Sequence, residues 1–201
     1  MLPGPILLAD RDSGLARNGY LWAMPFPVVT WSLLAASLVA ADPTVLRQAV
    51  LGSDTARIEQ GRTFQVLVLA GPGGTQRTTL PHPVHSLELG DLDGDGSVDV
   101  LVGVTKSNRH DPAMRRRIQI WTRGEDRLKP LWLGTKLVAE LRECRIVARP
   151  GGRRDLLSLE TRGKDWLVAR LRWSGFGFEV DSMLVDGADS SRAAATWRDA
   201  R

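Results

Sequence analysis

Residues 89–104 read Leu-Gly-Asp-Leu-Asp-Gly-Asp-Gly-Ser-Val-Asp-Val-Leu-Val-Gly-Val, and this stretch decides the fold class. Carboxylates stand at positions 1, 3, 5 and 9 of the acidic loop Asp91–Asp99, with glycines at positions 4 and 6. Apolar residues flank the loop on both sides, which predicts two short strands joined by a tight turn. Alternating carboxylates in such a turn converge on one point, so we expect the loop to hold a cation.

Calcium is the cation that suits this loop. It takes about 6–8 oxygen ligands at about 2.3–2.6 Å, and four crowded carboxylates would repel one another without it. An EF-hand is excluded because its position 12 needs a bidentate Glu, where this chain has Val102, and because its flanks are helices. A dockerin-type loop fails at the same position.

The stretch Leu89–Val104 resembles the FG-GAP (VCBS-type) repeat of integrin α-subunits and bacterial propellers, where a loop of the form Asp-x-Asp-Gly-Asp-Gly-x-x-Asp joins two strands of a blade. The Phe-Gly and Gly-Ala-Pro signatures of that family are not evident. The resemblance implies an all-β fold of propeller-like antiparallel blades. It also implies one Ca²⁺, whose ligands would be the backbone carbonyl of Ser97 and the side chains of Asp91, Asp93, Asp95 and Asp99.

A degenerate second repeat follows the first. Val147, Arg149, Gly151 and Asp155 occupy its four ligand positions, so no calcium is expected there. Arg153 and Arg154 are expected to stabilise that loop by hydrogen bonds instead. Asp99 and Asp155 lie 56 residues apart, which leaves room for fewer than three repeats after Asp42, whereas propellers have about 4–8 blades. An incomplete or open propeller, a β-sandwich, or a ring completed by a second copy of the chain are the alternatives.

Short apolar runs bounded by Gly, Pro and Asp predict ten strands in the exported part. They are Phe64–Ala70, Thr75–Leu80, Val84–Leu89, Val98–Val104, Arg117–Trp121, Pro130–Leu133, Arg145–Ala148, Asp155–Glu160, Trp166–Trp173 and Phe178–Leu184. The segment Thr44–Ile58 is expected to hold the only helix, and Thr105–Arg116 a long inserted loop. The β-repeat domain is expected over residues 42–185, with the calcium repeat at 84–133, the degenerate repeat at 143–184, and a flexible tail at 186–201.

The N-terminal segment reads as a signal peptide over residues 1–41. No charge occurs between Asn18 and Ala41, Arg17 stands ahead of the apolar run, and small residues precede Asp42. The sequence therefore predicts export, with a secreted or periplasmic mature protein. An uncleaved single membrane anchor or a buried helix are the alternatives for the same segment.

The composition predicts a basic surface and argues against disulfide, zinc-thiolate and histidine metal sites. The net charge is +4, and arginines crowd the second half of the chain, which favours an anionic partner or a solvated basic face. The single cysteine, Cys144, rules out an intramolecular disulfide and a thiolate zinc site, and is expected in the core. His82 and His85 lack a third ligand at metal-binding spacing.

The sequence therefore predicts an exported, calcium-binding β-repeat module that acts in binding or as a structural component of the envelope or extracellular space. A second protein or an anionic glycan is the expected partner, or a second copy that completes a propeller; nucleic acid is disfavoured by the export signal. The alternative is an envelope carbohydrate-active enzyme, a hydrolase or lyase, or its accessory domain. No recognisable nucleophile, acid or base supports the enzyme.

Overall fold

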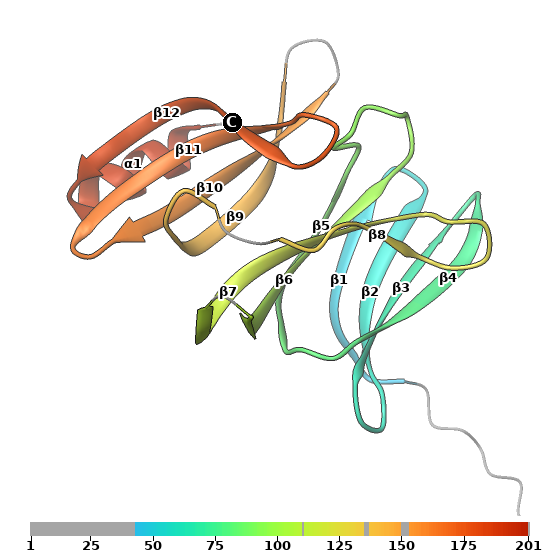
Figure 1. The fold of residues 1–201 in the computed structure, drawn as a ribbon. Helices are drawn as coiled ribbons and strands as arrows, with labels where there is room; N and C mark the ends of the chain where they lie inside the picture. The colour runs from blue at the N-terminus through green and yellow to red at the C-terminus, as the bar shows by residue number, and fades with distance from the viewer. Residues whose placement is uncertain (1–42, 110, 135–136, 150–152, 201) are drawn as a thin grey trace, which may run out of the picture. The chain divides into compact units, whose positions relative to one another are not determined.

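The computed structural model describes residues 43–109, 111–134, 137–149 and 153–200, which form twelve strands and one helix (Figure 1). The predicted signal peptide lies outside these ranges. The first sheet contains β1 (Val45–Leu51), β2 (Asp54–Gln60), β3 (Gln65–Gly71) and β4 (Gly74–Leu80). The second contains β5 (Val84–Gly90), β6 (Asp99–Asn108), β7 (Asp111–Thr122) and β8 (Lys129–Trp132). The third contains β9 (Glu140–Ala148), β10 (Arg154–Arg162), β11 (Asp165–Trp173) and β12 (Phe178–Ala188), and α1 (Ser190–Asp199) follows.

Each sheet is a four-stranded antiparallel meander in which strands consecutive in sequence pair with one another. The first strands of successive sheets lie together, β1 beside β5 and β5 beside β9. The prediction of an all-β fold with antiparallel four-stranded units is confirmed. The estimate of fewer than three repeats is wrong, because the described residues form three sheets; they form no closed ring.

The second sheet is buried on both faces. Val100, Val102 and Val104 of β6 pack into a cluster with the first sheet. Leu101 of the same strand joins Ile118 of β7 in a cluster with the third sheet. This two-sided burial explains why β6 reads as an unbroken apolar run without polar alternation, and each fully buried side chain of this size contributes about 1.5–3 kcal/mol.

The third sheet is covered on its far face by α1. Ala193 of the helix is fully buried in a cluster that includes Leu157 and Val168, and Trp197 packs against it. Asp189 caps the helix N-terminus by accepting the Arg192 N–H at 2.8 Å. The tail that was predicted to be flexible therefore holds the end of β12 and the one helix of the described chain.

Two local predictions from the sequence are wrong. The segment Thr44–Ile58 forms β1 and most of β2 rather than a helix. The two strands are joined through Gly52, whose φ of +58° suits the first position of a tight hairpin turn. The expected loop Thr105–Arg116 is mostly a continuation of β6 and β7, which pair as far as Lys106 with Arg115 and, beyond a register shift, Asn108 with Asp111. In the described ranges no helix is long and apolar enough to cross a membrane.

Candidate metal centre

The acidic loop closes the hairpin between β5 and β6, where Gly90 pairs with Asp99. Its turns are built by carboxylates that accept backbone N–H groups. Asp91 accepts from Gly94 through Oδ1 (2.7 Å) and from Gly96 through Oδ2 (3.1 Å). Asp93 accepts from Asp95 at 3.1 Å. Gly94 and Gly96 have φ values of +81° and +85°, a region that residues with a side chain rarely adopt, so the two glycines are required by the path of the loop.

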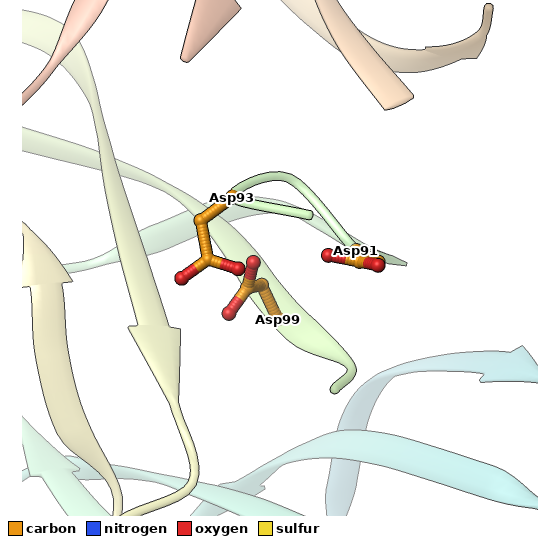
Figure 2. Close-up of side chains that lie close together, drawn as sticks. All are labelled: Asp91, Asp93 and Asp99. Atoms are coloured by element: carbon orange, nitrogen blue, oxygen red, sulfur yellow. The ribbon is translucent and has the colours of Figure 1, made fainter. Parts of the chain in front are cut away.

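Three of the predicted ligands come together (Figure 2). Asp91, Asp93 and Asp99 each offer one carboxylate oxygen, and these oxygens lie within 4.8 Å of one another. Asp95 is exposed and is not part of this group, and its Oδ1 accepts the Ser97 N–H at 2.7 Å. The loop thus presents a three-carboxylate site with the two remaining candidates beside it.

Asp99 is the buried member of the group, with a relative exposure of 0%. Its Oδ2 accepts the Leu92 N–H at 3.0 Å, but its Oδ1 accepts no hydrogen bond from the described residues. Burial raises the pKa of Asp99 to about 6, although the Leu92 amide, the Thr122 hydroxyl and the Asp93 amide act to lower it. Burial also raises the pKa of Asp93. An ionised carboxylate in this position costs several kcal/mol unless a cation compensates it.

A comparison of the three sheets shows that Asp99 lacks the arginine partner that its counterparts have among the described residues. Each sheet has an Asp at or next to the start of its second strand: Asp54, Asp99 and Asp155. Asp54 lies 2.8 Å from a guanidinium nitrogen of Arg123. Asp155, only 2% exposed, lies within 3.5 Å of two guanidinium groups. Within the described ranges Asp99 forms no ion pair, so the protein supplies a cation at two of these positions and none at the third.

These observations fit a hard divalent cation at Asp91, Asp93 and Asp99. All the offered donors are carboxylate oxygens, the ligands that Ca²⁺ prefers, and two ligands on opposite sides of a calcium ion lie about 4.6–5.2 Å apart. The Oδ1 of Asp99, which accepts no hydrogen bond from the described residues, could coordinate a metal ion at the buried end of the group. The geometry supports metal binding and leaves the identity of the ion to the sequence resemblance.

In the degenerate repeat, arginine side chains compensate the buried Asp155. The guanidinium groups that pair with Asp155 belong to Arg149 (3.4 Å) and Arg170 (3.5 Å), rather than to Arg153 or Arg154. Arg149 also reaches Asp181 of β12 at 3.5 Å. Arg170 comes from β11, so its role could not be recognised from the spacing of the repeat.

Many of the arginines that make the sequence basic are engaged within the fold. Arg115 pairs with Asp111 and Glu140, and Arg117 pairs with Asp111. Arg145 donates to carbonyl oxygens of Trp197 and Ala200. Several arginines of the expected basic face therefore have partners within the fold.

Among the described residues, Cys144, His82 and His85 belong to no group of three potential metal ligands. Cys144 is buried in the cluster between the second and third sheets, and burial raises the pKa of its thiol to about 12. Burial also lowers the pKa of His85 to about 4, with Arg116 and Arg47 acting in the same direction. In the described part of the chain the only group of three or more potential metal ligands is the Asp91, Asp93 and Asp99 cluster.

Comparisons of the chain with protein-family models, with curated proteins and with solved structures give no match. The likeness to FG-GAP repeats therefore stays a prediction from the acidic loop and its flanking strands.

Proposed function

We propose that the chain is an exported β-repeat module of the FG-GAP (VCBS) kind, tightened by one calcium ion, that acts in binding or as a structural component of the envelope or extracellular space. The observation that carries the proposal is the contrast between Asp99 and its two counterparts. Asp54 and Asp155 have arginine partners, whereas Asp99 is buried with one oxygen unpartnered. A bound cation at Asp99 resolves that difference.

The loop is connected to the core, so ion binding is expected to stabilise the whole domain. Leu92, which lies between two of the clustered aspartates, is 4% exposed and packs in the cluster shared by the second and third sheets. Its N–H also donates to Asp99. A cation that orders the carboxylates would thereby fix the position of Leu92 in this core.

Thermal unfolding with calcium and with a chelator tests the proposal. A ligand that binds only the folded state stabilises it by about 2.7 kcal/mol at a hundredfold excess over its dissociation constant. For a domain of this size that corresponds to a rise of roughly 5–10 °C in melting temperature. Magnesium is expected to give a smaller rise, because it demands a tighter octahedral shell. Identical melting curves in calcium and in chelator at neutral pH would refute the calcium site.

The binding role is favoured over an enzymatic one by the arginine partners of the two carboxylates in the cavity between the second and third sheets. Asp111 and Glu140 line it, and both pair with Arg115, at 3.0 and 2.6 Å. Although desolvation raises the pKa of Asp111, the Ala113 amide, Arg115 and Arg117 lower it below its ordinary value overall. A carboxylate held in its ionised form by arginine is a poor proton donor for glycoside cleavage.

Export is tested separately by N-terminal sequencing of the protein isolated from its host. A mature chain that begins near Asp42 would support a secreted or periplasmic protein. An intact segment on a membrane-bound species would replace this with a single N-terminal anchor.

A further inference from the structure

A cavity of about 430 Å³ lies between the second and third sheets, away from the acidic loop. β7 supplies one wall through residues 111 and 115–118. Trp132, Gly134 and residues 137–141 supply a second wall, and Thr161 and Arg162 of β10 contribute to the lining. This volume is in the range of small-molecule sites, which are about 300–1,000 Å³.

The floor of the cavity is apolar. Ile118 and Leu141, 1% and 4% exposed, lie in the core cluster between the two sheets, and Leu137 and Val138 pack against the same cluster. Trp132 adds an aromatic surface. Its ring meets Phe178 edge-on, with centroids 5.3 Å apart, so a neighbouring strand helps to fix the orientation of the indole.

The walls are held in place by polar contacts. The Ala139 N–H donates to the buried carboxylate of Glu160, which also accepts from Ser158 at 2.6 Å. Gly134 lies so close to β7 that a Cβ there would stand 2.0 Å from the Ile118 carbonyl oxygen. Gly134 is thus packed against the second sheet and Ala139 is bonded to the third, so these two parts of the lining are held by the fold.

The lining is positive overall. Four arginines (115, 116, 117 and 162) face two carboxylates, Asp111 and Glu140. Both carboxylates are engaged by Arg115, and Asp111 also by Arg117. Arg116 is exposed and, in the described ranges, forms no ion pair with a carboxylate; its Nη1 donates to the Arg142 carbonyl. Arg162 is 62% exposed and lies 4.0 Å from Asp186, so it too has capacity for another anion.

We infer that this cavity binds a small organic carboxylate with a compact ring, whose ring lies against Trp132 and the apolar floor and whose acid group pairs with Arg116 and Arg162. Guanidinium groups bind carboxylates through paired hydrogen bonds, and an aromatic surface accepts either a sugar ring or an aromatic ring. The inference rests on the binding role proposed above and specifies its ligand, but it does not depend on calcium.

Calorimetric titration of the full chain in saturating calcium tests the inference. D-glucuronate and benzoate represent the two kinds of ring, and D-glucose and benzyl alcohol are their uncharged counterparts. We expect one of the acids to bind with a dissociation constant on the order of 1 mM and its uncharged counterpart at least tenfold more weakly. Absence of binding by both acids at 20-fold that concentration, or equal binding of the uncharged compounds, would overturn the inference.

Variants locate the site. Arg116→Gln and Arg162→Gln should each weaken binding about tenfold, since each removes a charge-assisted contact. Arg62→Gln removes the same charge from an exposed turn of the first sheet, outside the cavity lining, and should leave binding unchanged. The Trp132 indole N–H signal, assigned from Trp132→Phe, should shift in NMR spectra as ligand is added. Unchanged affinity in both arginine variants would place the acid elsewhere and refute this site.

The two proposals can fail separately. Carboxylate binding that persists in chelator, together with no calcium-dependent stabilisation, would refute the metal centre and retain the cavity site. Calcium-dependent stabilisation without carboxylate binding would retain the metal centre and refute the cavity site.

Discussion

Asp155 Oδ1 lies 3.4 Å from a guanidinium nitrogen of Arg149, and its Oδ2 lies 3.5 Å from one of Arg170, at the position in the third sheet that Asp99 holds in the second. The two aspartates are both buried and both begin or nearly begin the second strand of their sheet. Asp155 is therefore compensated from within the chain, whereas Asp99 has no ion-pair partner among the described residues. The same Asp→Asn change at the two positions can therefore be compared within one protein to test which aspartate binds calcium.

Asp99→Asn is expected to remove the calcium response. In chelator the same change should raise the stability by about 1–3 kcal/mol, because it removes a buried and unpaired negative charge. Chemical unfolding with and without calcium measures both effects. Asp126→Asn, in the exposed turn between β7 and β8, is the control and should change neither. Full calcium stabilisation of Asp99→Asn would contradict the assignment of this residue as a ligand.

Asp155→Asn is expected to behave in the opposite way. It leaves the guanidinium groups of Arg149 and Arg170 without their shared partner, and breaking a buried pair costs about 3–5 kcal/mol. The increase in melting temperature on adding calcium should stay as large as in the unmodified protein. A lost calcium response in this variant would mean that the third sheet takes part in ion binding.

His85 is expected to make the domain less stable in mild acid. Burial lowers its folded-state pKa to about 4, and the charged groups around it are Arg47 on β1, Arg116 on β7, and Arg142 and Glu143 on β9. The unfolded chain takes up a proton near pH 6.5 and the folded protein only near pH 4. The contribution of His85 to stability is therefore complete above pH 6.5 and is lost as the pH falls toward 4.

The test compares His85→Gln with the unmodified protein by urea unfolding in chelator between pH 4 and pH 8. The free energies of unfolding of the two proteins should differ by a constant amount above about pH 7. Below about pH 6.5 the unmodified protein should lose stability steadily relative to His85→Gln. Taking this difference cancels the titration of the other acidic groups. Parallel pH profiles over the whole range would show that the imidazole titrates normally.

Arg145→Ala is expected to loosen the C-terminal helix. The guanidinium carbon lies 4.7 Å from the centroid of the Trp197 ring, and Nη2 donates to the Ala200 carbonyl at 2.5 Å. Loss of these contacts should cost about 1–3 kcal/mol and increase hydrogen exchange in α1. Arg198→Ala is the control, because its guanidinium bonds only within the helix, to the Ala194 carbonyl, among the described contacts. Equal effects of the two changes would argue against a special role for Arg145.

Much of the fold could be predicted because the sheets are built from local hairpins. All ten predicted strands correspond to β3 to β12, since short β-branched runs between Gly, Pro and Asp signal a meander directly. The first hairpin was missed because β1 carries Leu46, Arg47 and Gln48, residues that favour helices, and its antiparallel pairing with β2 overrides that preference. The helix α1 was missed because its sequence is short and polar, and its stability comes from packing.

The acidic loop could be recognised because its ligands are contiguous in sequence. The convergence of Asp91, Asp93 and Asp99 follows from alternation within nine residues. The partners of Asp155 and the cavity lining could not be found in this way, since they combine residues from different strands and sheets. Arg170, Glu140 and Trp132 carry no local sequence signal; only the register of the strands brings them to their positions.

The helix α1 has a consequence for how many units the chain can stack. An array of repeated sheets grows by adding each new unit to the apolar face left open by the last one, and it stops where a terminal element covers that face. In the third sheet that face is occupied by Ala193 and Trp197. A fourth unit fused after Ala188 would have to displace this helix before it could dock, so the last eleven described residues act as the terminator of the array.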